Sequence, residues 1–294
     1  RGRGYGSTMS TRVKRHVRVS ELARAIGRTF EGEDFDLEAV APLSAPREGA
    51  LTFMNRPAVV SFPPKVAVFA AERPGAAAWI PTERPRLDFI KALRWLDQHA
   101  GFERFEGEPQ VHPSVTIGSG TTLGRGVVIG ERTVIGHNVR IADGARIGAA
   151  CIVKSGAVIG EDGFGFERDV DGTPLRMLHL GGVILGDRVE VGSLTTVCQG
   201  TLAPTIIEDD VKIDDQVHIA HNCWIKKKTL VTACAAISGG VTVGEQSLVA
   251  PSSSVLENVH VGDRVLVGIG AVVLRNVPSG ATVAGNPARA LDRE

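Results

Sequence analysis

Aliphatic residues recur at every sixth position through most of the chain after residue 114. Eight consecutive hexads run from Val115 to Asp162, three follow from Val183 to Gly200, and twelve run from Thr205 to Asn276. The third residue of each hexad is Ile, Leu or Val, as in VTIGSG, TVIGHN and VHIAHN. A period of six fits neither the 3.6-residue period of an amphipathic helix nor simple strand alternation. The pattern therefore predicts an architecture built from many copies of one short unit.

Each hexad predicts a short flat strand followed by a turn, and three hexads close one triangular coil. Third-place aliphatics point inward and stack on the coils before and after, while glycine or another turn-tolerant residue relieves the corners. Adjacent coils then pair as parallel strands. We expect a mainly β protein, with a parallel β-helix over residues 111–280.

Two interruptions break the repeat. Its phase is lost over residues 163–182, and it slips by four residues at 201–204. Excursions from an otherwise regular scaffold commonly carry function. We expect the 163–182 loop, which contains a Gly-Phe-Gly-Phe run, to wall a substrate site with Phe164 and Phe166.

Residues 9–100 lack the hexad and predict a small α/β domain. Apolar spacing and capping signals indicate helices at 20–26 and 87–99. Short apolar runs bounded by Pro and Gly indicate buried strands at 51–54 and 66–69. We assign this domain to binding a nucleotide or sugar.

Three further segments complete the division of the chain. Residues 1–8, which precede Met9, are small, polar and basic and predict an expression remnant. Residues 101–110 are acidic and contain glycine, which is typical of a linker into the β-helix. Residues 281–294 form a C-terminal tail.

Composition argues against several function classes. Lys and Arg total 33 and Asp and Glu total 33, so the formal net charge is zero, whereas a nucleic-acid binder normally carries a basic excess. No apolar run reaches the roughly 18 residues that a membrane span needs. The four cysteines form no Cys-x-x-Cys pair, which argues against a zinc ribbon or a disulfide scaffold. We expect a cytoplasmic protein whose thiols are packed in the fold.

Three motifs occur in a specific order along the chain. Leu51-Thr-Phe-Met-Asn55 lies in the α/β domain, Gly160-Glu-Asp-Gly-Phe-Gly-Phe166 at the first interruption, and Ile219-Ala-His-Asn222 in the β-helix. Together they resemble the UDP-3-O-acylglucosamine N-acyltransferases over roughly residues 20–276. The resemblance implies a left-handed β-helix that transfers a hydroxyacyl chain from acyl carrier protein to a glucosamine amine in lipid A synthesis.

Two features depart from that family. Phe53 matches the first of two aromatics that sandwich uracil, but Val59 stands in place of the second, and Arg56 stands where the family has Asn. The chain stops at Glu294 after Gly285-Asn-Pro-Ala-Arg289, which resembles the ending of acetyltransferases that use coenzyme A.

These departures favour an N-acyltransferase that moves an acetyl or other short acyl group from acyl-CoA. Its acceptor would be the amine of a nucleotide-linked amino sugar for surface polysaccharide or lipopolysaccharide synthesis. The alternative is the lipid A enzyme itself, with hydroxyacyl-acyl carrier protein as the donor.

N-acylation needs a base for the amine proton and hydrogen-bond donors for the oxyanion of the thioester. His218 and His221 flank the inward Ile219, so both can reach the surface. A coil of three hexads places Gly239 directly above His221. The resemblance implies that His221 is the base and that the Gly239 amide is the oxyanion donor, and it matches Asp214 to an acidic position of the family.

Binding candidates fall into two groups. Those assigned to the substrate are Phe53, Asn222, His218, Phe164 and Phe166. Those assigned to the phosphates of coenzyme A or of a carrier pantetheine are Lys226 (the first of three consecutive lysines), Arg289 and Gly240.

A third hypothesis is a non-catalytic or metal-binding β-helix. Prism proteins related to carbonic anhydrase place three histidines around a metal at a subunit interface. The positions one coil after and one coil before His221 hold Gly239 and Ala203, neither of which binds metal. We therefore expect no metal.

We expect a homotrimer. One side of the prism is assigned an apolar outward surface that is too large to leave in water. Packing three prisms about an axis would bury one side of each and leave a cleft from His221 toward Arg289, which suits an extended thioester donor. The residues assigned to the outward places are Thr195, Thr196, Val211, Val217, Cys223 and Val241.

Overall fold

The computed structural model describes residues 11–290, which divide into two compact units. Of the described residues, the first unit takes in 11–104, 165–181 and 201–203. The second takes in residues 105–164, 182–200 and 204–290. Each unit has its own hydrophobic core. The expected expression remnant at 1–8 lies outside the described residues.

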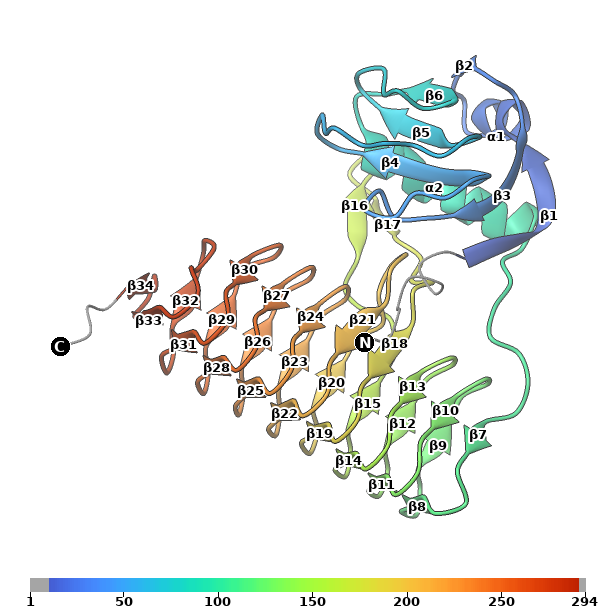
Figure 1. Cartoon of the computed structure of the whole chain (residues 1–294). Helices are drawn as coiled ribbons and strands as arrows, with labels where there is room; N and C mark the ends of the chain where they lie inside the picture. Colours follow the sequence, from blue (N-terminus) through green and yellow to red (C-terminus); the bar gives the residue numbers. More distant parts are fainter. Residues whose placement is uncertain (1–10, 291–294) are drawn as a thin grey trace. The chain divides into compact units, whose positions relative to one another are not determined.

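The first unit contains a six-stranded sheet in the order β1-β3-β4-β5-β6-β2, with β3 to β6 parallel (Figure 1). Both helices contribute to the core cluster that covers one face of this sheet. The elements are β1 Thr11–Arg18, α1 Val19–Ala25, β2 Glu31–Gly32, β3 Asp36–Val40, β4 Ala50–Met54, β5 Ala67–Ala70, β6 Ala78–Pro81 and α2 Pro85–His99. Neither helix is long and apolar enough to cross a bilayer, and the described range holds no other α-helix.

The first interruption of the repeat forms a hairpin that belongs to this unit. Its antiparallel strands are β16 Phe166–Arg168 and β17 Pro174–Arg176. Met177, directly after the hairpin, is buried in the same core cluster as α2. The Lys91 ammonium of α2 lies 2.7 Å from the Asp169 carboxylate, which adds an ion pair to the apolar contact. The inserted loop therefore contributes to the core of the α/β unit.

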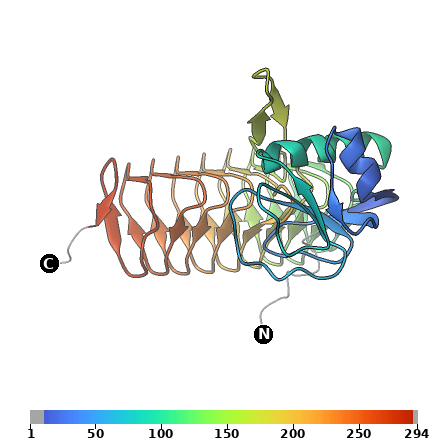
Figure 2. The same ribbon diagram turned by 90° about the horizontal axis from the view of Figure 1, so that it is seen from above.

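The second unit is a parallel β-helix, whose coils stack along one axis (Figure 1 and Figure 2). The first sheet contains β7 Gln110–Val111, β10 Val128–Ile129, β13 Arg146–Ile147, β18 Val183–Leu185, β21 Thr205–Ile207, β24 Trp224–Ile225, β27 Thr242–Val243 and β30 His260–Val261. The second contains β8 Thr116–Ile117, β11 Val134–Ile135, β14 Ile152–Val153, β19 Glu190–Val191, β22 Lys212–Ile213, β25 Leu230–Val231, β28 Leu248–Val249, β31 Leu266–Val267, β33 Thr282–Ala284 and β34 Arg289–Ala290. The third contains β9 Thr122–Leu123, β12 Arg140–Ile141, β15 Val158–Ile159, β20 Thr196–Val197, β23 His218–Ile219, β26 Ala236–Ile237, β29 Ser254–Val255 and β32 Val272–Val273.

Third-place aliphatics point into the prism, as the repeat predicts. Ile219, Val243 and Val267 are fully buried in one continuous core cluster. Registered pairs such as Ile219 with Ile237 confirm the coil of three hexads. Parallel pairing holds throughout the three sheets except at the final β33–β34 pair, which is antiparallel.

First-place residues also point inward, so the assignment of an apolar outward surface was wrong for most of its residues. Val211, Val217, Cys223 and Val241 are all buried in the core, and Thr195 is buried as well. Successive residues of a strand alternate between its two faces, so places one and three share the inner face and only place two faces out. Thr196 is the one member of that set in a second place.

Corner geometry requires a left-handed residue in the sixth place of most hexads. Asn138 has φ 52°, Asn222 has φ 61° and Asn258 has φ 60°. Asparagine tolerates this conformation better than most residues because its short amide can bond locally. The sequence of the corners therefore follows from the tight turn between one flat sheet and the next.

The inward direction of the first place can be tested by placing a charge there. Val241→Asp should lower the free energy of unfolding by about 3–5 kcal/mol, because it buries a carboxylate without a partner. Thr242→Asp, one residue further on and facing out, should leave the unfolding temperature nearly unchanged. Thermal unfolding of both variants gives the comparison, and equal destabilisation would contradict this orientation.

Candidate active site

Both interruptions of the repeat fall at the same corner of the solenoid. The chain leaves the third sheet after Ile159 and enters the first sheet at Val183. It leaves the third sheet again after Val197 and enters the first sheet at Thr205. The next coils carry residues 220–222, 238–240, 256–258 and 274–276 at this corner, which we call the third corner. Most of the irregular backbone of the solenoid is therefore concentrated at one edge.

His221 and Gly239 stack at the third corner, as the three-hexad coil predicts. A Cβ atom added to Gly239 would lie 2.6 Å from Cε1 of the His221 ring, closer than such atoms approach in proteins. Gly239 does not have a positive φ, so glycine is needed here for space and not for backbone conformation. Gly240, by contrast, has φ +71° and donates its N–H to the His221 carbonyl at 2.9 Å.

The fifth-place amides of the corners fall into two groups, and the Gly239 amide belongs to the group without an acceptor in the described range, together with those of Glu131, Asp143 and Glu257. At several corners a side chain from the following coil accepts the fifth-place N–H: Asp143 accepts from Arg125 at 3.0 Å, and Asp263 accepts from Glu245 at 2.9 Å. The Gly239 N–H has no hydrogen-bond partner within residues 11–290. A donor beside an imidazole is a suitable arrangement for stabilising a developing oxyanion.

Asn222 contacts the His221 ring through its side chain. Nδ1 of His221 lies 3.0 Å from Oδ1 of Asn222. Sequence analysis assigned Asn222 to the substrate and did not predict this contact. The available signal was that Asn222 directly follows His221 in the sixth place of its hexad, where the backbone is left-handed.

Within one chain the structure does not bring Asp214 to His221. Asp214 lies at the preceding corner, where its Oδ2 accepts the Ala233 N–H at 3.2 Å. Strand β23 separates the two residues. The carboxylate serves as one more corner cap.

His218 lies on β23, three residues before His221. Its Nδ1 is 2.8 Å from the Thr196 hydroxyl. Burial, and secondly the neighbouring His221, lower the pKa of His218. Its imidazole is therefore neutral at neutral pH, where it can act as a hydrogen-bonding group beside His221.

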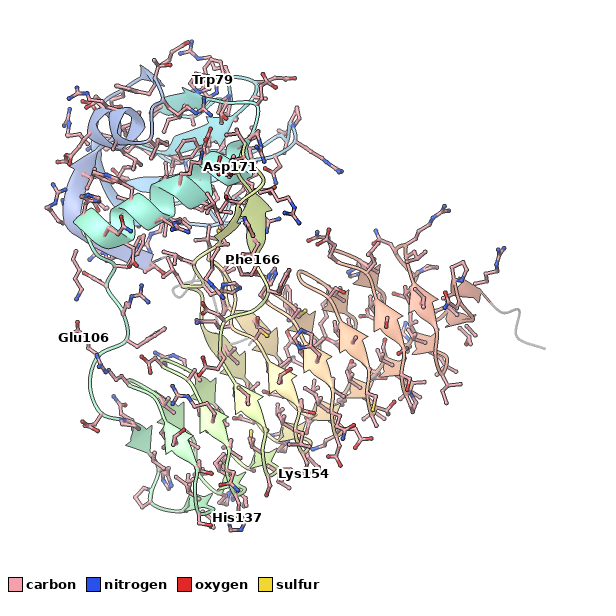
Figure 3. All side chains as sticks on the ribbon, turned by 180° about the vertical axis from the view of Figure 1, so that it is seen from behind. Trp79, Glu106, His137, Lys154, Phe166 and Asp171 are labelled. Atoms are coloured by element: carbon pink, nitrogen blue, oxygen red, sulfur yellow. The ribbon has the colours of Figure 1, made fainter. Side chains whose placement is uncertain are left out.

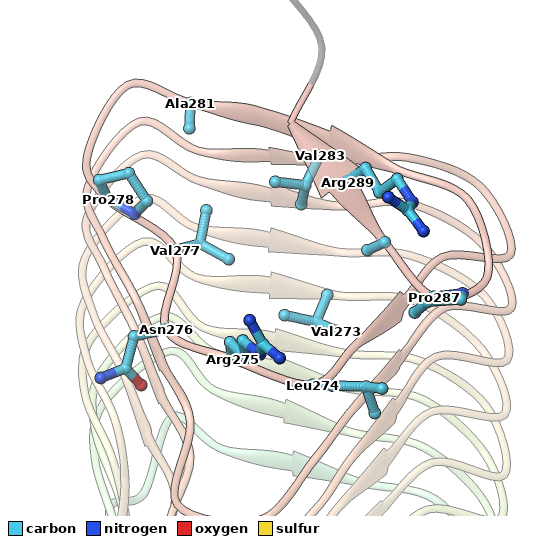
Figure 4. Close-up of a pocket in the computed structure, with 11 residues that line it drawn as sticks. Val273, Leu274, Arg275, Asn276, Val277, Pro278, Ala281, Val283, Pro287 and Arg289 are labelled. Atoms are coloured by element: carbon cyan, nitrogen blue, oxygen red, sulfur yellow. The ribbon is translucent and has the colours of Figure 1, made fainter.

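Two candidates for donor phosphates lie apart in the solenoid. Lys226 is at the corner after the first sheet, with Nζ 5.5 Å from the centre of the Trp224 ring. Arg289 lines a cavity of about 400 Å³ at the C-terminal end (Figure 4). Arg275, at the third corner, lines the same cavity and was not identified from the sequence. Neither arginine has an ion-pair partner among the described side chains.

The aromatic candidates occupy both units. Phe53 of β4 is half-buried, with its ring centre 4.8 Å from that of Phe89. Val59 is fully exposed. Phe166 lies at the start of the hairpin (Figure 3), with the Arg176 guanidinium 4.9 Å from its ring centre. Phe164 belongs to the solenoid unit and is 86% exposed.

Metal ligands are not clustered in the part of the chain that the structure describes. No group of three or more His, Cys, Asp or Glu side chains there is arranged to hold an ion. Within the same range, the His218–His221 pair has no third ligand of these types in reach.

Comparisons with known proteins agree with the repeat and with the α/β unit. The family model described as bacterial transferase hexapeptide (six repeats) matches residues 126–161. UDP-3-O-acylglucosamine N-acyltransferase of Delftia acidovorans is 37% identical over 253 residues, which cover 78% of this chain and 73% of that protein. The protein of the same name from Hahella chejuensis is 44% identical over 98 residues, covering 33% of this chain and only 28% of that protein.

Solved structures share the solenoid. UDP-N-acetylglucosamine O-acyltransferase of Moraxella catarrhalis has a TM-score of 0.58 at 22% identity, covering 64% of this chain and 71% of that one. The Francisella novicida UDP-N-acetylglucosamine acyltransferase has a TM-score of 0.57 at 24% identity, covering 64% and 66%. At these identities the likeness shows the fold alone.

The fold and the repeat define a hexapeptide-repeat transferase with a left-handed β-helix. Because a 37% identical relative is matched over 73% of its length, across both units, the chain belongs to the UDP-3-O-acylglucosamine N-acyltransferase family.

The close approach of Gly239 to His221 predicts that alanine substitutions at Gly239 and Gly240 have different effects. Gly239→Ala should displace the imidazole while changing the stability of the fold by less than about 1 kcal/mol, because the ring can rotate away. Gly240→Ala should cost about 1–2 kcal/mol, because it forces a side chain into the left-handed region. Crystal structures and thermal unfolding of both variants test this; an unmoved ring in Gly239→Ala would contradict it.

Proposed function

We propose that this protein transfers a hydroxyacyl chain from a carrier-protein thioester to the amine of UDP-3-O-acylglucosamine in lipid A synthesis. The observation that carries the proposal is the 37% identity to the Delftia acidovorans enzyme over 78% of the chain, a span long enough to include His221 wherever it begins. This reaction fits better than the short-chain transfer from acyl-CoA that the sequence favoured, because the relatives that match the chain carry this name.

The His221 corner supplies the groups that direct acyl transfer needs. The amine lone pair attacks the thioester carbonyl, a C–N bond forms, and the C–S bond breaks to release the carrier thiolate, which is then protonated. His221 takes the proton lost by the amine nitrogen. The Gly239 N–H donates to the carbonyl oxygen while it carries negative charge. The reaction needs no metal and no redox cofactor.

The acceptor sites are assigned from the residues available in each unit. Phe53 is the ring that we assign to the uracil base, without a second aromatic at Val59. His218 is assigned to the glucosamine near His221, and Phe164 and Phe166 are assigned to the acyl chains.

The donor is assigned to the third corner on the C-terminal side of His221. Arg275 stands three coils beyond His221 in the same corner, roughly 14 Å away at about 4.8 Å per coil. With Arg289 it brings two guanidinium groups to one cavity, which suits the phosphate of a pantetheine arm. Gly240 lies at the third corner, between His221 and Arg275, and is assigned to the same donor. Lys226 lies at a different corner from His221 in the same chain, so its assignment to the donor phosphates has less support.

A homotrimer remains our proposal, with its interface moved to the second sheet. The outward places of three successive strands there are Leu230, Leu248 and Leu266. Leu230 is 43% exposed and Leu266 is 37% exposed in the single chain. An apolar row of this kind is commonly covered by another copy in symmetric oligomers.

Product analysis distinguishes the two donors. Purified protein with UDP-3-O-acylglucosamine should form an N-acylated product from hydroxyacyl-acyl carrier protein at least about tenfold faster than from acetyl-CoA. Mass spectrometry of the products measures both rates. Faster acetylation of a nucleotide amino sugar that lacks the 3-O-acyl chain would support the short-chain enzyme instead.

Removal of the base tests the assignment of His221. His221→Ala should lower kcat by about 10²–10⁴-fold, the usual contribution of a general base. His137→Ala is the matched control, because His137 occupies the same place of its hexad at another corner and should retain wild-type kcat. A His221→Ala variant that keeps more than about a tenth of the turnover would remove His221 from the mechanism.

A further inference from the structure

The chain contains two His-Asn pairs in identical places of the hexad. His137-Asn138 ends the hexad TVIGHN, and His221-Asn222 ends VHIAHN. Both asparagines are left-handed, with φ 52° and 61°. The two histidines nevertheless have different partners.

His137 acts as a corner cap. Its Nδ1 accepts the Ser119 N–H at 3.0 Å, and the Ser119 hydroxyl lies 2.9 Å from the same nitrogen. A ring nitrogen that accepts a backbone N–H carries no proton, so neutral His137 has its proton on Nε2. The ring projects from the outer edge of the solenoid, near Lys154 of the next coil (Figure 3).

His221 has the opposite arrangement. Its Nδ1 faces the Asn222 amide oxygen, which can only accept a hydrogen bond. Nδ1 therefore carries the proton, and Nε2 holds the lone pair that accepts a proton. The same dipeptide thus gives opposite tautomers at two corners.

The four-residue slip explains why His221 does not cap the coil before it. At the third corner of that coil, Gln199 donates its N–H to the Glu161 carbonyl at 3.0 Å, so this amide is already satisfied. His137, in contrast, is the cap of an amide in a regular coil. With the preceding amide bonded elsewhere, Nδ1 of His221 can bond to Asn222.

Thr205, the first residue after the slip, holds Asn222 from the coil below. Its buried hydroxyl accepts the Asn222 N–H at 2.9 Å. Other first-place threonines accept the N–H of the first-place residue one coil later, as Thr121 does from Val139 and Thr133 from Cys151. Thr205 instead accepts from the residue one position earlier in the chain, Asn222, whose side-chain amide contacts the His221 ring.

We infer that Asn222 is a positioning residue that fixes His221 in the Nδ1–H tautomer, with Thr205 fixing the backbone of Asn222. The catalytic consequence rests on the proposed function, whereas the tautomer itself does not. An amide orients the ring without a negative charge, so it does not stabilise the imidazolium as a carboxylate would. The geometry thus presents Nε2, which holds the lone pair, as the proton acceptor of the ring.

Three titratable groups near this corner are neutral near pH 7, whereas the Asp162 carboxylate, which accepts a hydrogen bond from the Gln199 side chain at 2.8 Å, adds a negative charge near Cys198. Burial raises the pKa of Cys198 to about 11 and that of Cys223 to about 12, so both thiols keep their protons. His218, on the same strand, has a lowered pKa and is neutral as well. The coil above presents Gly239 and Gly240, which have no titratable side chain.

NMR of protein labelled with 15N-histidine tests the tautomer without any substrate. His221 should show the Nδ1–H form and His137 the Nε2–H form. Asn222→Asp should move the titration midpoint of His221 to higher pH by about one unit or more, because the new carboxylate favours the imidazolium. Asn138→Asp, the matched control, should leave that midpoint unchanged. An Nε2–H form of His221, or an unmoved midpoint in Asn222→Asp, would overturn the inference.

Kinetics then test the consequence. In Asn222→Asp the acidic limb of the kcat/KM profile should move to higher pH by the same amount as the titration midpoint. Asn222→Gly keeps the left-handed corner but removes the amide, and it should lower kcat by about tenfold to a hundredfold with little change in KM. Wild-type kcat and pH profile in Asn222→Gly would overturn the positioning role. Absence of acyl transfer by the wild-type protein would instead reject the proposed function and leave the NMR result standing.

Discussion

The vertical registration of the coils is the constraint on which the candidate site depends. Each strand bonds to the strand one coil away, so a corner residue lies directly over the matching residue of the previous coil wherever the coils are regular. A large side chain at a corner of one coil then limits the size of the side chain at the matching position of the next coil. His221 and Gly239 show the limit clearly, because a methyl group on Gly239 would collide with the imidazole. The spacing that builds the core also determines what the corner can hold.

The interruptions change this registration where chemistry is assigned. Across the slip, Thr196 pairs with His218, whereas a regular coil would bring Asp214 opposite it. The extra residues lie in the coil before His221, so the usual caps of that corner are rearranged. Gln199 bonds to Glu161, and Thr205 bonds to Asn222. A change in length at one coil therefore alters the hydrogen bonds of the next without disturbing the core.

Corner caps account for most of the polar residues that could be mistaken for a site. Asp143, Asp214 and Asp263 each accept a backbone N–H of an adjoining coil. His137 has the same role. These side chains satisfy amides that the tight corners would otherwise leave without a partner. The Gly239 amide has no such acceptor and lies beside the His221 ring, and this combination is what suits it to the proposed chemistry.

The sequence alone determined the solenoid, the three-hexad coil, the small α/β domain and the stacking of Gly239 on His221. The solenoid features follow from a six-residue pattern that recurs many times, so many hexads give the same evidence. The α/β domain follows from the loss of that pattern and from its own apolar spacing. Only the tertiary structure decided that first-place residues such as Val241 face inward, that Met177 after the hairpin packs into the α/β core, and that Arg275 joins Arg289 at one cavity. It also decided that Asn222, and not Asp214, contacts the His221 ring. Hydrogen-bond partners between coils depend on which side chains meet across loops of unequal length, and a repeating pattern does not contain that information.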